Sequence, residues 1–224
     1  MQNLFPDETC VIACSGPSLK KVDCFSLGVP VLVISTAIRY LKKADYWILA
    51  DHLNEMHGPE GKLAWEDPNI LKVVPRAKTL NKHRDQNRKD FIVVDVQDSN
   101  KATDNHQRDL FNPSLPLFRG PHKTVTMAIQ WAHSRGAKKL IFAGNDLKAD
   151  CVEKKYAYEF QKFDMKKKHN FSKTLDQVRV CMQGWYPIAK MKGFQWYSWE
   201  CGDVFSHMVP TFTPDMIEQI KKKS

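Results

Sequence analysis

The chain has 224 residues, of which 42% are hydrophobic and 26% charged, a composition typical of a globular protein with a substantial core. Its 34 lysines and arginines against 25 acidic residues give a net charge of +9, which favours encounters with anionic partners. No apolar run approaches the ~20 residues of a membrane span, and the first residues lack the pattern of a secretory signal, so we expect a cytoplasmic protein.

Short apolar runs alternate with helical segments through the first fifty residues. Residues 9–13, 31–35 and 46–50 predict buried strands, and the first of them enters a Gly-Pro turn. A short helix over residues 19–25 and another that Thr36 begins separate these strands. Strand–helix–strand steps at such short intervals favour a parallel sheet.

The middle of the chain has a weaker pattern. Residues 70–74 and 91–94 are apolar enough for strands, whereas residues 77–90 are basic and contain few core-forming side chains. Residues 97–116 are polar and contain two prolines, which predicts a long surface loop.

Regular patterns return after Gly120. Apolar residues at helical spacing predict a helix over residues 125–132, and a buried strand follows at residues 140–143. A lysine-rich segment, residues 148–174, predicts a small lid. A long amphipathic helix from Leu175, a strand at residues 194–199 and a helix opened by Pro214 complete the chain. We therefore predict one α/β domain over residues 1–224, with a Rossmann-like, mostly parallel sheet flanked by helices.

The six cysteines are scattered and form no C-x-x-C pair, which argues against a structural zinc site. We expect free thiols, several of them buried.

The turn Ser15-Gly16-Pro17-Ser18 carries the main chemical signal. Small residues between a strand and a helix let main-chain N–H groups approach a phosphate, and Pro17 suits a first helical position. The chain lacks both G-x-G-x-x-G and the phosphate loop G-x-x-x-x-G-K-[ST], which argues against a dehydrogenase or a P-loop NTPase. We predict a nucleotide-binding turn, although a ligand-free turn would have the same pattern.

The run VIACSGPSL at residues 11–19 resembles the first strand and turn of the Campylobacter-type bacterial sialyltransferases. Flagellin glycosylation factors and archaeal pterin pyrophosphokinases have a similar turn. GPHKT at residues 120–124 and the strand that ends in Gly144-Asn145-Asp146 resemble a second signature of these families. Tyr156, Tyr158 and His169, before the helix from Leu175, resemble the sialyltransferase lid.

The resemblance implies a glycosyltransferase whose donor is linked to UDP or CMP, with nucleotide contacts from Ser15, Gly16, Thr124, Asn145 and Asp146. The chain carries Ser15 where those enzymes carry Asn, and Asn145 where they carry Ile, which leaves the donor sugar open.

Sugar transfer requires a base for the acceptor hydroxyl and donors for the departing phosphate. The resemblance makes His169 the base and Tyr156 and Tyr158 the phosphate donors; a solvated histidine and packed tyrosines are the structural alternatives. Because no D-x-D motif is present, we expect a metal-independent reaction that requires no cofactor. Thr36, Asp51 and His52 follow predicted strands and are candidates for the substrate pocket, and the sequence assigns Asp51 and His52 no particular role there.

The acceptor could be a glycan, a lipid-linked sugar or a hydroxylated base in viral DNA, for which the basic charge is suited. Trp185 could stack on a base, but its spacing with Met182 and Ala189 favours the core. A pyrophosphokinase would need Mg²⁺ held by aspartates, for which Asp51, Asp146 and Asp150 are the candidates. A non-catalytic nucleotide or nucleic-acid binding protein is a further alternative, and a homo-oligomer is compatible with all of these.

Overall fold

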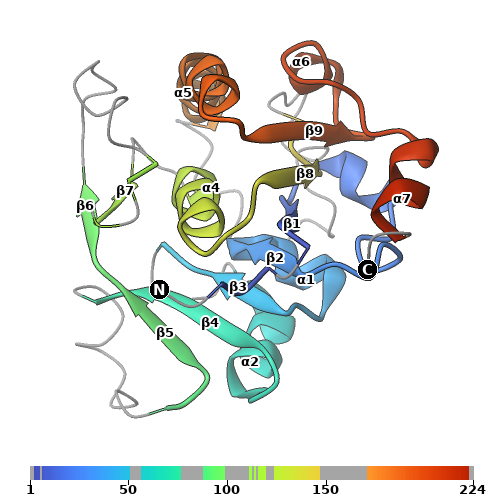
Figure 1. The fold of residues 1–224 in the computed structure, drawn as a ribbon. Coiled ribbons are helices and arrows are strands. Elements are labelled where there is room, and N and C mark those ends of the chain that lie inside the picture. Colours follow the sequence, from blue (N-terminus) through green and yellow to red (C-terminus); the bar gives the residue numbers. More distant parts are fainter. Residues whose placement is uncertain are drawn as a thin grey trace.

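Seven parallel strands form the central sheet, in the order β5-β4-β3-β2-β1-β8-β9 (Figure 1). The computed structural model describes residues 3–5, 7–50, 57–76, 88–98, 111–112, 114, 116–119, 124–146 and 171–221. The strands of this sheet are β1 (Thr9–Ala13), β2 (Val31–Ile34), β3 (Tyr46–Ile48), β4 (Leu71–Pro75), β5 (Phe91–Val94), β8 (Lys139–Ala143) and β9 (Gln195–Trp199). The predicted α/β class and parallel sheet are confirmed, and the predicted strands lie within one or two residues of their expected bounds.

The central strands are buried on both faces, which explains their continuous apolar sequence. All five residues of β1 and all four of β2 are buried, as is usual where helices cover both sides of a parallel sheet. Ala13 pairs with Val33 of β2 and with Ala143 of β8, and Ala143 pairs with Trp199 of β9. This register brings the carboxyl ends of β1, β2, β8 and β9 to the same level.

Helices cover the two faces of the sheet (Figure 1). The helical elements are η1 (Pro17–Lys21), η2 (Ser35–Ala37), α1 (Ile38–Leu41), α2 (Gly58–Glu66), α4 (Thr124–Ser134), α5 (Phe171–Met191), α6 (Asp203–Ser206) and α7 (Pro214–Lys221). Residues of α4 and α5 pack with Ile12 and Phe142 in one buried cluster. Residues of η1, α1 and α2 pack with Val11 and Ile141 in the other. The alternation of Val11 and Ile12 follows from the two-residue period of a strand.

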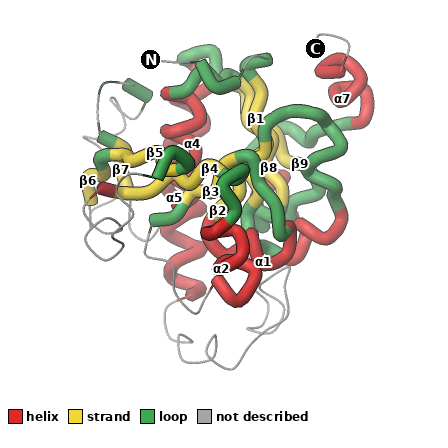
Figure 2. The backbone as a smooth tube through the Cα atoms, turned by 90° about the horizontal axis from the view of Figure 1, so that it is seen from below, coloured by secondary structure: helices red, strands yellow, loops and turns green. Residues whose placement is uncertain are grey.

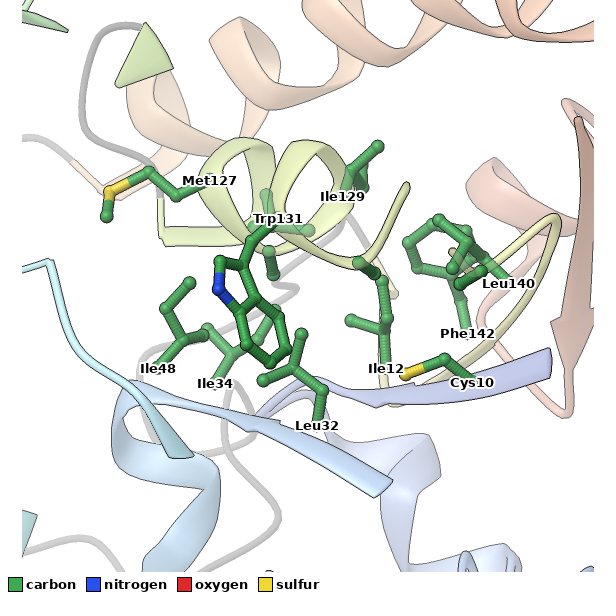
Figure 3. Packing of buried hydrophobic residues seen from close by; sticks show 14 of the residues in the cluster. Cys10, Ile12, Leu32, Ile34, Ile48, Met127, Ile129, Trp131, Leu140 and Phe142 are labelled. Atoms are coloured by element: carbon green, nitrogen blue, oxygen red, sulfur yellow. The ribbon is translucent and has the colours of Figure 1, made fainter. Parts of the chain in front are cut away.

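The α4 face of the core is centred on Trp131. Its ring points from α4 towards Leu32, Ile34 and Ile48 of the strands beneath it (Figure 3). Trp131 also packs edge-on against Tyr46, with ring centroids 5.1 Å apart. Trp185 of α5 is buried in the same cluster, as its helical spacing predicted.

Four elements differ from the sequence expectation. A small parallel pair, β6 (Val96–Asp98) with β7 (Leu117–Arg119), flanks the segment expected to be one long surface loop and lies beside β5 (Figure 2). The helix α2 was not expected. The long helix α5 begins at Phe171, so the last four residues of the predicted lid are helical. The rest of that lid lies outside the described residues.

A buried ionic cluster lies at the start of β4 and β5. The ammonium of Lys72, which is fully buried, is 2.7 Å from Oδ2 of Asp90 and also donates to the carbonyl of Asp67. Arg88 donates to both oxygens of Asp90, over 3.0 and 2.7 Å. These hydrogen bonds hold the pKa of Asp90 well below its usual range. The two cations stabilise the charged carboxylate where β4 and β5 meet.

A second buried polar group is His133, near the end of α4. Its Nδ1 lies 2.6 Å from the carbonyl oxygen of Ala137, and its Nε2 accepts a hydrogen bond from Nε1 of Trp196 over 3.0 Å. This arrangement suits a neutral imidazole that donates through Nδ1. Burial lowers the pKa of His133 to about 4, so the ring is neutral in the folded protein near pH 7.

The five described cysteines, Cys10, Cys14, Cys24, Cys181 and Cys201, are buried free thiols. None of the described helices combines the length and apolar character that a bilayer crossing requires.

Candidate functional site

The loops that follow β1, β8 and β9 meet at the carboxyl edge of the sheet. The chain passes from β1 outward to β5 and then returns to β8 on the other side of β1. The element after β1 packs on one face of the sheet and α5, after β8, packs on the other. Such a reversal of strand order is where open α/β sheets bind ligands.

Asp146 joins these three loops. Its Oδ2 accepts a hydrogen bond from the N–H of Ser18 over 2.9 Å, and its Oδ1 accepts one from the N–H of Gly202 over 2.7 Å. The hydroxyl of Ser18 also donates to Oδ1. One partly exposed carboxylate therefore fastens the turn after β1 and the turn after β9 to the end of β8.

Three glycines make this close approach possible. A Cβ at Gly16 would lie 2.5 Å from Oδ2 of Asp146, and one at Gly202 would lie 3.1 Å from its Cβ. Gly144 has a φ of +68°, and a Cβ there would be 2.9 Å from that of Leu19. Gly16 and Gly144 of the predicted motifs, together with Gly202 after β9, are thus required by packing at the site itself.

The amides of the Gly-Pro-Ser turn are largely engaged inside the protein. The N–H of Gly16 donates to the carbonyl of Gly144 over 2.8 Å, Pro17 has no N–H, and Ser18 donates to Asp146. The sequence predicts these amides as phosphate donors. In this conformation, the residue of the turn that a ligand could contact is the partly exposed Ser15. The carboxylate of Asp146 lies close to the same turn.

The remaining predicted residues take different positions. Thr36 is buried in η2, beyond the end of β2, and Thr124 begins α4, where Val125 packs in the same cluster as Cys14. Asn145 is buried, and its amide donates to the sulfur of Met182 on α5 over 3.4 Å, so it connects the strand end to the helix. His169, Tyr156, Tyr158, Asp51 and His52 lie outside the described residues.

Two further polar residues lie at the end of β2. The hydroxyl oxygen of Ser35 is 3.5 Å from Nε2 of His57, the residue before α2. A Cβ at Gly58 would lie 3.2 Å from Nε of Arg39 and 2.9 Å from Oε2 of Glu60, so the guanidinium of this α1 residue lies close to the first turn of α2. Sequence reasoning missed all three residues, because His57 stands 22 positions from Ser35 and no local pattern connects them.

The thiols of Cys14 and Cys201, at this edge of the sheet, are poor nucleophiles. Burial raises the pKa of Cys201 to about 11 and the pKa of Cys14 well above its usual value. Cys201 also donates to the carbonyl of Phe142 over 3.1 Å. Both cysteines are therefore protonated near pH 7 and are unsuited to act as thiolate nucleophiles. Within the described ranges, no group of His, Cys, Asp or Glu is arranged to hold a metal ion.

No protein-family model matches the sequence, and no curated protein matches it either. Among solved structures, the chain is similar to the sialyltransferase CstII from Campylobacter jejuni in complex with the substrate analogue cytidine-5'-monophosphate. The identity is 14%, the match covers 91% of this chain and 84% of that one, and the TM-score is 0.41. A second CST-II structure, with a trisaccharide acceptor and CMP, matches at 14% identity over 91% and 85% of the chains, with a TM-score of 0.40.

Proposed function

We propose that this chain is a glycosyltransferase that takes a sugar from a nucleotide-activated donor. The observation that carries the proposal is the convergence of three strand-end loops on Asp146 where the strand order reverses. An open α/β sheet binds nucleotides at such a position, and the sequence around Ser15 and Asp146 resembles enzymes that use activated sugars.

Asp146 suits a hydroxyl-bearing ligand better than a phosphate. Among the described residues, its Oδ1 accepts two hydrogen bonds and its Oδ2 accepts one, which leaves an acceptor position on Oδ2. A ribose or sugar hydroxyl would donate to that position, as acidic residues do in other nucleotide sites of this fold class. The nucleoside or sugar of the donor is therefore assigned to the Asp146 side.

The transfer itself needs groups beyond this edge. On the resemblance, His169 removes the proton of the acceptor hydroxyl, and Tyr156 and Tyr158 donate to the departing phosphate without a metal ion. The donor is linked to UDP or CMP. The acceptor is a glycan hydroxyl or a hydroxylated base in DNA, and the net charge of +9 supports an anionic one.

A nucleotide panel tests the proposal. Melting temperature is measured with CMP, UMP, UDP, ATP and DNA, each with and without Mg²⁺, because a ligand that binds the folded state raises it. Stabilisation by CMP or UDP without metal supports the glycosyltransferase. Stabilisation by ATP only with Mg²⁺ indicates a pyrophosphokinase, and stabilisation by DNA alone indicates a binding protein.

The reaction is then followed directly. The chain is incubated with CMP- and UDP-linked sugars and with glycan or hydroxylated-DNA acceptors, and the products are analysed by mass spectrometry. A mass increase of one sugar on an acceptor supports transfer. Absence of product and of donor hydrolysis from every donor that binds would contradict it.

A further inference from the structure

Four exposed lysines lie on the face of the sheet that η1 and α1 cover. Lys20 and Lys21 are the last residues of η1, and Lys42 and Lys43 follow α1 directly. All four side chains are exposed, and none of them forms an ion pair or a side-chain hydrogen bond with another described residue. We call these four residues the lysine surface. Their charges are available to an anionic partner.

The two pairs of lysines belong to one surface. η1 follows β1, α1 follows β2, and these two strands are neighbours in the sheet. Leu19 of η1 and Ile38 of α1 pack in the same buried cluster. The ammonium nitrogen of Lys43 lies 4.0 Å from the centre of the Phe25 ring, on the chain that leads from η1 to β2. The end of α1 therefore contacts the segment that follows Lys21.

The lysine surface has an excess of positive charge. Between residues 17 and 45, the other exposed charged side chains are those of Asp23 and Asp45. Each accepts a main-chain hydrogen bond, from the N–H of Phe25 over 3.1 Å and from the N–H of Val31 over 2.8 Å. Four lysines against two aspartates leave a net charge of +2. An ammonium group binds a phosphate as a point charge, without a fixed geometry, so such a surface suits a chain of phosphates.

The lysine surface begins beside the candidate site. Because η1 starts within the Gly-Pro-Ser turn, Lys20 follows Ser18 by only two residues. On the side away from β1, α2 packs against α1, and there Lys62 stands between Glu60 and Glu66, so the excess of positive charge ends. An anionic chain bound along the lysine surface would therefore extend to the turn at the carboxyl edge of β1.

The apolar side chains nearby favour a partner that stays in water and keeps its bases stacked. Phe25 and Tyr40 are partly buried and pack against the core, so neither is free to enter a bilayer or to stack on an unpaired base. The exposed Leu63 of α2 lies beside Glu60 and Glu66, where an anionic lipid surface would be repelled. Double-stranded DNA presents regularly spaced phosphates on its outside and can be bound through them alone.

We propose that the lysine surface binds the phosphate backbone of double-stranded DNA, which makes a hydroxylated base of that DNA the acceptor of the sugar. The inference rests on the proposed function for the transfer itself, but the binding of DNA can be measured without it. Because the contacts are to phosphates, binding should depend strongly on salt and little on DNA sequence. A base that reacts has to leave the stack to reach the carboxyl edge of β1.

Fluorescence anisotropy of the full chain with a labelled DNA duplex, at a series of salt concentrations, tests this inference. Each phosphate that a lysine neutralises releases counterions, so four contacts predict a slope of about −3.6 in a plot of log K against log salt concentration. Affinity should therefore fall about 100-fold between ~50 and ~200 mM salt. Lys20→Gln with Lys21→Gln removes two contacts and should reduce this loss to about tenfold. The other pair, Lys42→Gln with Lys43→Gln, should have the same effect.

A matched control separates contacts at the lysine surface from the effect of net charge. Lys89→Gln with Lys190→Gln removes the same charge from two exposed lysines, one before β5 and one on α5. α5 packs on the opposite face of the sheet from η1 and α1. This control should leave the slope unchanged, because neither lysine belongs to the lysine surface.

The outcomes separate this inference from the proposed function. If the duplex does not bind, or if folded variants of both lysine pairs keep the slope of the wild type, the inference is overturned, and the proposed function stands as long as nucleotides bind. If the duplex binds with the stated dependence on the lysines but no nucleotide binds, the DNA surface stands and the proposed function falls. Tighter lysine-dependent binding to phosphatidylglycerol vesicles or to polyglutamate than to DNA would also overturn the inference. Circular dichroism checks each variant, and the single substitutions Lys20→Gln and Lys43→Gln decide if a double variant does not fold.

Discussion

Replacing Asp146 by asparagine would test the junction of the three loops, because it changes charge and hydrogen bonding with little change in shape. The carboxylate accepts three hydrogen bonds, from two donors of Ser18 and one of Gly202. An asparagine has one carbonyl oxygen. If that oxygen replaces Oδ1, the amide NH₂ faces the N–H of Ser18, and two donors oppose each other.

The cost of Asp146→Asn follows from these contacts. Ser18 is buried, so leaving its N–H without an acceptor costs about 1–3 kcal/mol, and the loss of charge weakens the other two hydrogen bonds. We expect unfolding in urea to show a loss of about 2–4 kcal/mol. Asp23→Asn is the control, since Asp23 is exposed and its Oδ1 accepts from Phe25 alone among the described residues. A loss below about 0.5 kcal/mol for Asp146→Asn, equal to that of the control, would refute this account of the junction.

Three other predictions concern the frame around the site. Lys72→Met should destabilise the fold by about 3 kcal/mol in urea unfolding, because it removes one cation from buried Asp90; an unchanged midpoint would show that the pair contributes nothing. The pKa of His133 is about 4 in the folded protein and ~6.5 in the unfolded chain, so on acidification the unfolded chain is protonated at a higher pH than the folded protein. The stability of the fold should therefore fall by about 3 kcal/mol as pH drops from ~6.5 to ~4. This slope should flatten in His133→Gln, and an equal slope in that variant would assign it elsewhere. In thermal unfolding, Gly16→Ala should destabilise the fold more than Gly193→Ala by at least about 1 kcal/mol. A Cβ at Gly16 would overlap its neighbours, whereas a Cβ at Gly193 meets nothing within 4 Å and is strained only by the φ of +81°. Equal losses of stability would count against tight packing at Gly16.

The central sheet could be predicted from unbroken apolar runs, because its strands are buried on both faces. The helix α2 escaped prediction for the opposite reason. Its first four residues include Gly58, Pro59 and Gly61, which have poor helix propensity, and it buries few apolar side chains. Packing against α1 stabilises it, and that contact is not visible in the local sequence. The three-residue strands β6 and β7 are likewise too short to give a pattern.

The candidate site was partly predictable for a geometric reason. The carboxyl ends of parallel strands lie at one edge, so Ser15 and Asp146 were expected to be close once both were assigned to strand ends. The sequence could not show that Asp146 would occupy the amide of Ser18, because this depends on the register of β1 with β8. The approach of His57 to Ser35 depends on how α2 packs, which is also a tertiary property.

The most direct test of the central claim is a crystal structure of the chain with CMP or UMP at saturating concentration. We predict the nucleotide at the carboxyl edge of β1, beside the turn at Ser15, with one of its hydroxyls on Asp146. A nucleotide bound elsewhere, or a carboxyl edge without nucleotide in a crystal whose protein binds it in solution, would contradict the account.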